Sequence, residues 1–261
     1  MLQVQIQEIS IRSQSRNRSI LKDVFFDLGR NQVFTVLGKN GSGKSTFIKS
    51  VTGLLDNKFY SVSGSVLFKG KDLLALKNEK LLEIRRDKIK YVFQDAVNSF
   101  DHLKKLKYYF DLLTKDKNEV NDLLEYFLLA GSKQLFEMYA YELSGGMAQR
   151  VSFVLALLSK PEIIILDEPT SGIDSAIANL FLLKLKDFAK SNENSVLLVT
   201  QDILFAEKVS DKIAYLSNSR LSEFYEAGEF FNALNDPQLN EFLQANKQIE
   251  SPTSSGEKWA L

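Results

Sequence analysis

A nine-residue segment near the start of the chain combines glycines with lysines and hydroxyl side chains. It is Gly38-Lys39-Asn40-Gly41-Ser42-Gly43-Lys44-Ser45-Thr46, and it follows the apolar run Val33 to Leu37. Glycines let the backbone curl so that successive N–H groups face a phosphate chain, and the N-terminus of a following helix adds positive potential. We expect Lys44 to reach the outer phosphates and Ser45 to offer its hydroxyl to Mg2+. The segment predicts a nucleoside triphosphate site, and the alternative is a glycine-rich turn that happens to carry a lysine.

Two acidic residues directly follow a second apolar run, Ile163 to Leu166. Such a run is typical of a strand buried on both faces, and ligands of open α/β sheets bind at the carboxyl ends of the strands. Adjacent strand residues point opposite ways, so we expect Asp167 to hold magnesium through its water shell and Glu168 to polarise the water that attacks the γ-phosphate. The alternative, two solvated charges at a strand end, would be preferred only without the glycine-rich loop.

Another glycine-containing helix start lies between these two motifs. Leu143-Ser144-Gly145-Gly146-Met147-Ala148-Gln149-Arg150 precedes an apolar helical pattern over Val151 to Leu158. A serine and two glycines at a helix N-terminus can bind an anion through free backbone N–H groups. In isolation the segment would more often be an ordinary helix capped by its serine. The glycine-rich loop alone does not separate kinases, GTPases, helicases and transport motors, so the combination of motifs decides the class.

The three motifs, in this order, resemble those of ATP-binding cassette (ABC) proteins, and the resemblance extends from Leu2 to about Leu221. In that family two cassettes clamp ATP between the phosphate loop of one and the signature of the other. The resemblance implies that residues 38–46 hold the phosphates of one nucleotide. It also implies that Ser144, Gly145 and Gly146 cap the nucleotide bound by the partner cassette.

The resemblance assigns two further polar residues. Gln94, within Tyr91-Val92-Phe93-Gln94-Asp95, resembles the family's residue that senses magnesium and the membrane partner. Asp174, in Ser171-Gly172-Ile173-Asp174, resembles the loop that couples the two nucleotide sites. The simpler interpretations are a surface amide for Gln94 and a helix N-cap for Asp174, and the N-cap and coupling roles are compatible.

Three stretches narrow the class, because Ser63 to Leu74, Arg85 to Gln94 and Leu143 to Arg150 resemble the ATPases of dipeptide, oligopeptide and nickel importers. The resemblance implies an ATP-hydrolysing subunit, with Mg2+, that energises import of peptides or of a metal or metal chelate. The implied partners are a second, different ATPase subunit, two transmembrane permease subunits and, indirectly, an extracytoplasmic binding protein. The implied location is the cytoplasmic face of the cell membrane. Many members carry a cysteine-bearing C-terminal extension, whereas this sequence has no cysteine, so the cargo stays open.

The sequence departs from the family pattern at Gln201, where the family usually places a histidine that orients the attacking water. Gln201, in Leu198-Val199-Thr200-Gln201-Asp202, can still donate a hydrogen bond but cannot carry charge near neutral pH. We count Gln201 with Lys44 and Glu168 as the catalytic group, and we predict slow turnover at this site. The aromatic residue that usually stacks on adenine is replaced by Ile11, which predicts loose base selectivity.

The elements that must position these residues alternate between strand and helix. Val33 to Leu37, Ile163 to Leu166 and Val196 to Thr200 predict buried parallel strands, and Leu2 to Ile11 alternates like a half-buried one. The predicted fold is α/β, a P-loop NTPase (RecA-like) core with an N-terminal antiparallel β subdomain and an inserted helical subdomain at about residues 98–160. We predict one ABC ATPase domain over residues 1–250 and a flexible tail over residues 251–261.

Composition limits the possible functions. The 33 basic and 33 acidic residues cancel, which removes the bulk positive field used to hold nucleic acid, so no nucleic acid partner is expected. No apolar stretch approaches membrane-spanning length. Two alternatives stay open: a catalytically weakened nucleotide-binding partner in a heterodimeric ATPase pair, which Gln201 favours, and a soluble ABC ATPase without a transport role.

Overall fold

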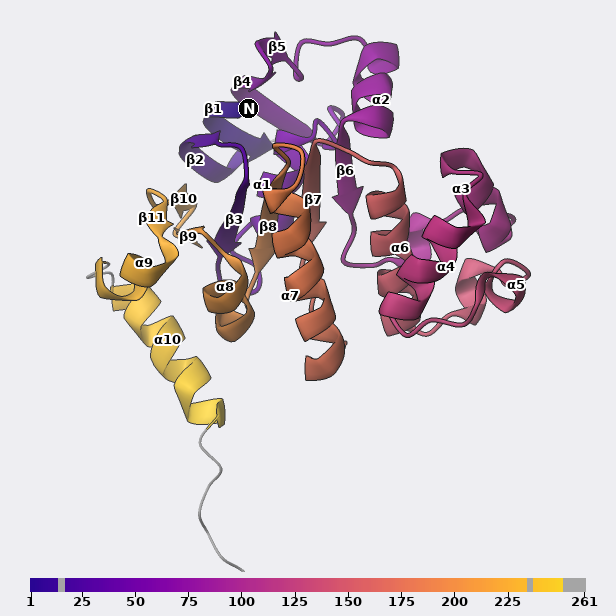
Figure 1. Cartoon of the computed structure of the whole chain (residues 1–261). Coiled ribbons are helices and arrows are strands. Elements are labelled where there is room, and N and C mark those ends of the chain that lie inside the picture. The colour runs from indigo at the N-terminus through magenta and orange to yellow at the C-terminus, as the bar shows by residue number, and fades with distance from the viewer. Residues whose placement is uncertain (14–16, 234–236, 251–261) are drawn as a thin grey trace, which may run out of the picture.

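The computed structural model describes residues 1–13, 17–233 and 237–250. The predicted flexible tail, residues 251–261, lies outside the described residues. Figure 1 shows a central sheet with helices on both sides and a group of helices set apart next to α6. Within the described residues, no helix combines the length and the hydropathy needed to cross a membrane. The mixed α/β arrangement predicted from the alternating patterns is confirmed.

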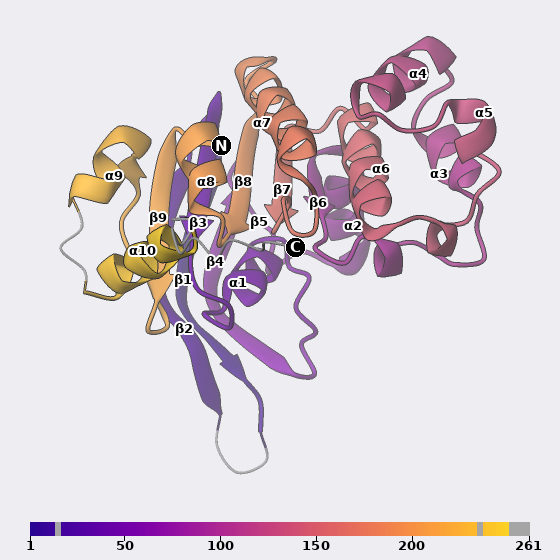
Figure 2. The same cartoon turned by 90° about the horizontal axis from the view of Figure 1, so that it is seen from below.

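The first part of the chain forms antiparallel strands. They are β1 (Leu2–Ile11), β2 (Arg18–Leu28), β4 (Tyr60–Phe68) and β5 (Lys71–Asp72). β1 is central and pairs with β2 on one side and β4 on the other. β2 runs over 11 residues, of which Leu21, Val24 and Leu28 are buried. Figure 2 shows β1 and β2 running past α1 and projecting beyond the parallel strands.

The parallel strands form one end of the sheet in the order β9, β3, β8, β7, β6, with β6 at its edge. Their bounds are β3 (Gln32–Leu37), β6 (Ile89–Val92), β7 (Ile163–Asp167), β8 (Ser195–Thr200) and β9 (Lys212–Ser217). Every residue of β7 and β8 is buried, which explains why these strands are continuous apolar runs. Two short strands, β10 (Arg220–Leu221) and β11 (Tyr225–Glu226), pair with β9, and β10 also joins β2.

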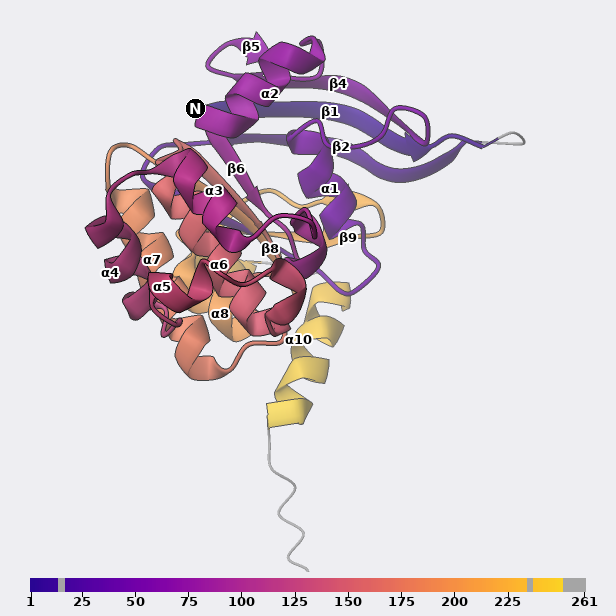
Figure 3. The same cartoon turned by 90° about the vertical axis from the view of Figure 1, so that its right-hand side faces the viewer.

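Helices cover the two faces of the parallel strands differently. α1 (Lys44–Val51) lies between the antiparallel strands and the parallel ones, as Figure 3 shows, and packs with Ile163 and Ile165 of β7. Ile164 and Leu166 point to the opposite face and pack with α6 (Gly145–Leu158) and α7 (Ser175–Lys190). The remaining core helices are α2 (Asn78–Asp87), α8 (Ile203–Val209), α9 (Ala227–Ala233) and α10 (Pro237–Glu250).

The segment between β6 and α6 is helical. It contains α3 (Leu106–Leu113), α4 (Lys117–Tyr126) and α5 (Ser132–Leu135), with short 3-10 turns at Val97–Ser99 and Ala140–Glu142. Phe110, Leu124 and Phe127 are buried, and the Phe127 ring packs edge-on against Phe153 of α6. This apolar contact attaches the helices to the α/β core. The domain boundaries proposed above, including the inserted helical subdomain at about 98–160, stay predictions.

Candidate functional site

The glycine-rich loop lines a cavity of about 620 Å³. Residues 40–46 form part of its wall, together with Gln94, Glu168 and Tyr60. The loop begins directly after β3 ends at Leu37 and closes where α1 begins at Lys44. The cavity therefore lies at the carboxyl edge of the parallel strands and at the N-terminus of α1, where anions bind.

Glycine is required in this loop by backbone geometry. Gly41 has φ 79° and Gly43 has φ 103°, in the left-handed region that side-chain-bearing residues rarely adopt. Gly43 is also the N-cap of α1, and a Cβ there would lie 3.3 Å from a methyl carbon of Leu21 on β2. The loop thus curls tightly against β2, and within it the Ser42 N–H donates to the Lys39 backbone oxygen at 3.2 Å.

The Lys44 side chain is 5% exposed and folded into the site. Its ammonium donates to the backbone oxygens of Gly38 (2.7 Å) and Lys39 (3.0 Å), and it lies 3.1 Å from Glu168 Oε1. A buried ammonium needs such partners because an unpaired charge is costly away from water. The predicted phosphate-binding lysine and the predicted general base are therefore in direct contact.

Asp167 is 3% exposed, and both of its oxygens have partners. Ser45 Oγ donates to Oδ1 at 3.1 Å, and the Tyr91 hydroxyl donates to Oδ2 at 2.8 Å. Burial, followed by the nearby charge of Asp167, raises the pKa of Tyr91 and keeps its hydroxyl a donor at neutral pH. The structure brings Ser45 and Asp167, two of the three side chains predicted to act on the metal, together, and the third, Gln94, lines the same cavity as Ser45.

Glu168 points away from Asp167 for a reason that differs from the one predicted. β7 ends at Asp167, and Glu168 has φ 49°, so its direction is set by a left-handed turn rather than by strand alternation. Two of the hydrogen bonds that hold Glu168 come from α6 and from the residue after β8: Gln149 Nε2 donates to the Glu168 backbone oxygen (3.1 Å), and the Gln201 N–H donates to Glu168 Oε2 (3.1 Å). Sequence reasoning missed both contacts because they depend on tertiary packing.

Gln201 and Gln94 both place exposed side chains beside this cluster. Gln94 follows β6 and lines the cavity. Gln201 follows β8, and its backbone rather than its side chain bonds Glu168. The residue that replaces the family's histidine therefore keeps its backbone support of Glu168.

Ser144, Gly145, Gly146 and Asp174 form a separate group. Ser144 caps α6 by accepting from Met147 N at 3.2 Å, and Asp174 caps α7 by accepting from Ile177 N at 2.9 Å. A Cβ on Gly146 would lie 3.4 Å from Ile173, so the two helix starts adjoin. None of these four residues lines the cavity of the glycine-rich loop. Within one chain the two groups of predicted site residues lie apart.

The aromatic side chain nearest the predicted adenine position comes from another strand. Ile11, at the end of β1, pairs directly with Arg18 of β2 and Tyr60 of β4, so the three side chains share one face of the sheet. All three line the cavity. Sequence reasoning missed Tyr60, because only strand register places it beside Ile11.

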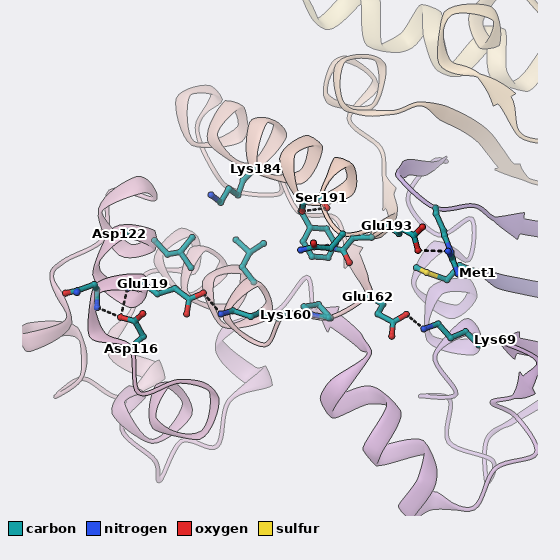
Figure 4. Close-up of a pocket in the computed structure, with 18 residues that line it drawn as sticks. Met1, Lys69, Asp116, Glu119, Asp122, Lys160, Glu162, Lys184, Ser191 and Glu193 are labelled. Carbon is teal, nitrogen blue, oxygen red and sulfur yellow. Dashed lines mark hydrogen bonds and ion pairs between the residues drawn. The ribbon is translucent and has the colours of Figure 1, made fainter.

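A larger cavity of about 990 Å³ lies elsewhere, between α4, the end of α7 and Met1 (Figure 4). Its cations are already engaged within the protein. Lys69 pairs with Glu162 and Lys160 with Glu119, as Figure 4 shows, and Arg30 pairs with Glu193. Lys184 lies over the Tyr126 ring. This cleft has no glycine-rich loop, so the smaller cavity is the better candidate for a phosphate ligand.

Residues 21–171 match the family described as "ABC transporter". The chain belongs to this family. The match spans the glycine-rich loop, the signature segment and the carboxylate pair, in agreement with the geometry above. The chain is accordingly an ATP-hydrolysing ABC-type ATPase.

Curated ABC relatives include ATP-binding proteins of importers. The oligopeptide transport protein OppD of Lactococcus lactis is 27% identical over 93% of this chain and 75% of its own length. The dipeptide transport protein DppD of Caldanaerobacter subterraneus is 34% identical over 80% of this chain and 67% of its own. The metal-staphylopine import protein CntD of Staphylococcus aureus is 28% identical over 84% of this chain and 83% of its own length. The predicted resemblance to peptide and metal importer ATPases is confirmed.

Solved ABC structures share the fold. The dimeric ATP-binding cassette MJ0796, in a post-hydrolysis state with ADP and Pi, aligns with a TM-score of 0.74 at 24% identity, covering 87% of this chain and 99% of that one. The protein cbiO1 of Clostridium perfringens, part of the ABC transporter complex cbiONQ, aligns with a TM-score of 0.68 at 23% identity, covering 93% of this chain and 98% of that one. The predicted P-loop NTPase fold class is confirmed.

Proposed function

We propose that this ABC ATPase binds ATP with Mg2+ in the cavity of residues 40–46 and hydrolyses it to energise import of peptides or of a metal or metal chelate. The proposal rests on four polar side chains that are buried or partly buried and make two contacts of 3.1 Å. Lys44 pairs with Glu168, and Ser45 donates to Asp167. Each has the chemical type that phosphoryl transfer requires.

The residues fit a magnesium ion. Among the described residues no group of three or more histidine, cysteine and acidic side chains could enclose a metal. Mg2+ is usually held by one or two protein oxygens together with substrate phosphates and water. Ser45 Oγ and Asp167 Oδ1 supply such oxygens at 3.1 Å from each other, and Gln94 lies on the same cavity wall. When bound, the ion would neutralise charge on the phosphate oxygens.

The other residues divide the remaining tasks. Lys44, released from the Gly38 and Lys39 oxygens, would bind the outer phosphate oxygens, and backbone N–H groups of the loop would hold the rest of the chain of phosphates. This exchange frees Glu168 from its ion pair to polarise the attacking water. The Gln201 N–H would keep the carboxylate in place during that step.

A second cassette would complete the site. The N-termini of α6 and α7 lie outside the cavity and are accessible to the nucleotide of another chain. They carry Ser144, Gly145, Gly146 and Asp174. The partner would be a different ATPase subunit, as in the importers that the chain resembles.

The helical segment offers a surface for the permease. Leu103 is 86% exposed, and Tyr141 is 57% exposed with its ring 6.3 Å from that of His102. Exposed apolar and aromatic side chains of this kind are typical of interaction sites. We infer that a transmembrane permease subunit, one of two in the complex, docks here and holds the chain at the cytoplasmic face of the cell membrane. An extracytoplasmic binding protein would deliver cargo to the permease subunits at the opposite face.

Co-expression with candidate permease chains tests this function. Membrane extraction and affinity purification should recover this chain with two membrane-spanning chains and a second ATPase. ATP hydrolysis by the purified complex should fall strongly in Glu168→Gln, with the complex still assembled. Recovery of the chain with ribosomes or DNA and without membrane proteins would contradict the transport role.

A second candidate is a catalytically weakened nucleotide-binding partner, and Gln201 in place of the family's usual histidine favours it. In that case Glu168→Gln in this chain would leave the ATPase rate of the complex nearly unchanged. The equivalent substitution in the other ATPase subunit would abolish it. Comparison of the two complexes separates the candidates.

A further inference from the structure

We propose that Tyr91 is a positioning residue for the cation site, fixing the Asp167 carboxylate so that only Oδ1 is presented toward Ser45. This inference rests on the proposed binding of Mg2+ with ATP. No motif assigns a task to this hydroxyl, since in the sequence Tyr91 is one aromatic residue of a short strand.

Strand register brings Tyr91 and Asp167 together. β6 pairs with β7 in parallel, and Tyr91 lies opposite Ile165. Asp167 follows Ile165 by two residues, so its side chain points to the same face of the sheet. Ile165 packs on the face that α1 covers, and Ser45 lies in the first turn of α1. Strand β6, strand β7 and helix α1 thus each deliver one hydroxyl or carboxylate to a single point.

Metal binding would affect the two hydrogen bonds to Asp167 differently. Ser45 Oγ, which donates to Oδ1, is itself a predicted metal-binding atom, so its contacts would be rearranged by a cation. The Tyr91 hydroxyl donates to the other carboxylate oxygen, Oδ2, at 2.8 Å, and Tyr91 is not a predicted metal-binding residue. Tyr91 is therefore the group that can hold the carboxylate through binding and release.

Holding Oδ2 has a chemical consequence for cation choice. A carboxylate with both oxygens free can bind a cation through both, as Ca2+ allows, whereas Mg2+ requires a tight octahedral arrangement with single oxygens. A hydrogen bond on Oδ2 occupies one of its lone pairs and fixes the carboxylate plane, which disfavours the two-oxygen mode and leaves Oδ1 to hold Mg2+ directly or through its water shell. Loss of an outer hydrogen bond of this kind commonly weakens metal binding by about 10- to 100-fold.

Tyr91→Phe tests the proposal, because it removes the hydroxyl and keeps the ring that packs 4.4 Å from Phe93. The probes are ATP with Mg2+, ATP with Ca2+ and ATP with EDTA, each titrated calorimetrically into the purified full chain. We expect affinity for ATP with Mg2+ to fall about tenfold, affinity with EDTA to stay within twofold, and the preference for Mg2+ over Ca2+ to narrow. Tyr126→Phe, which removes a hydroxyl bonded to Leu180 O in the helical segment, is the matched control and should change none of these.

The outcomes are distinguishable. An equal loss with Mg2+ and with EDTA, or no loss, would overturn the positioning role while leaving the proposed function intact. If the wild-type chain binds no ATP with Mg2+, the proposed function itself fails. Tyr91→Met gives a second test if Tyr91→Phe does not fold, with the same expected pattern. If neither variant folds, Tyr91 is a requirement of the fold and the proposal is wrong.

Discussion

Lys44 Nζ lies 3.1 Å from Glu168 Oε1, and the two side chains are only 5% and 7% exposed. The residue predicted to bind phosphate and the residue predicted to activate water thus neutralise each other. Triphosphate binding would replace Glu168 as the partner of Lys44. The ion pair therefore links the presence of nucleotide to the availability of the general base.

Lys44→Met should destabilise the nucleotide-free protein by about 3 kcal/mol, because Glu168 would keep a buried charge without its cation. The double variant Lys44→Met with Glu168→Gln should be more stable than Lys44→Met alone by about 1 kcal/mol or more. Urea unfolding of the single and double variants, followed by circular dichroism, measures these differences. Additive effects of the two substitutions would show that the ion pair carries no coupling energy.

Gln201→His should speed single-turnover ATP hydrolysis in the assembled complex about tenfold. A positioned group that stabilises the transition state commonly raises the rate of the chemical step about a hundredfold, and glutamine retains part of that effect. The control is Gln201→Ala, which keeps the backbone N–H that bonds Glu168 and should hydrolyse more slowly than wild type. Rapid-quench kinetics measures the chemical step. An unchanged rate in Gln201→His would remove the argument that this site is weakened.

Tyr60→Ala should lower affinity for ATP about fivefold, because stacking of a base on an aromatic ring is worth about 1 kcal/mol or more. Tyr60→Phe should bind as wild type does, and Phe59→Ala, at the neighbouring exposed position, serves as a control. Because Ile11 stands where the family usually has an aromatic residue, we also expect ATP and GTP to bind with similar affinities. A strong preference for ATP in fluorescence titrations would contradict this prediction.

Glu162→Gln should reduce stability at neutral pH by about 1 kcal/mol. Partial burial raises the pKa of Glu162, but hydrogen bonds from Lys69 (2.5 Å) and Lys88 (3.2 Å) outweigh it and lower the pKa overall. A lowered pKa stabilises the fold above the unfolded value of about 4.3, and this contribution is lost as pH falls further. Wild type and variant should therefore converge near pH 3 in chemical unfolding. A difference that persists at that pH would point to packing instead of charge, and Glu125→Gln is an exposed control.

The local parts of the site were predictable from sequence. Gly43 and Lys44 are adjacent residues in a loop whose geometry follows from glycine and from the helix start, and Asp167 follows an apolar run that had to be a buried strand. The parallel core was predictable for the same reason. Spacing along the chain was sufficient wherever neighbouring residues act together.

Contacts between distant segments were not predictable. Tyr91 meets Asp167 only through the pairing of β6 with β7, and Gln149 reaches the Glu168 backbone only through the packing of α6. The direction of Glu168 was predicted from strand alternation, whereas a left-handed turn sets it. These details depend on register and on tertiary packing, which a single sequence does not specify.

Calorimetric titration with ATP and Mg2+ measures whether the loop of residues 40–46 binds the nucleotide. The purified, folded chain is compared as wild type, Glu168→Gln and Lys44→Met. We expect wild type and Glu168→Gln to bind one nucleotide per chain. Lys44→Met should lose at least tenfold in affinity for ATP, because its phosphate-binding cation is gone. Equal affinity in Lys44→Met, or no binding by folded wild type, would contradict this expectation.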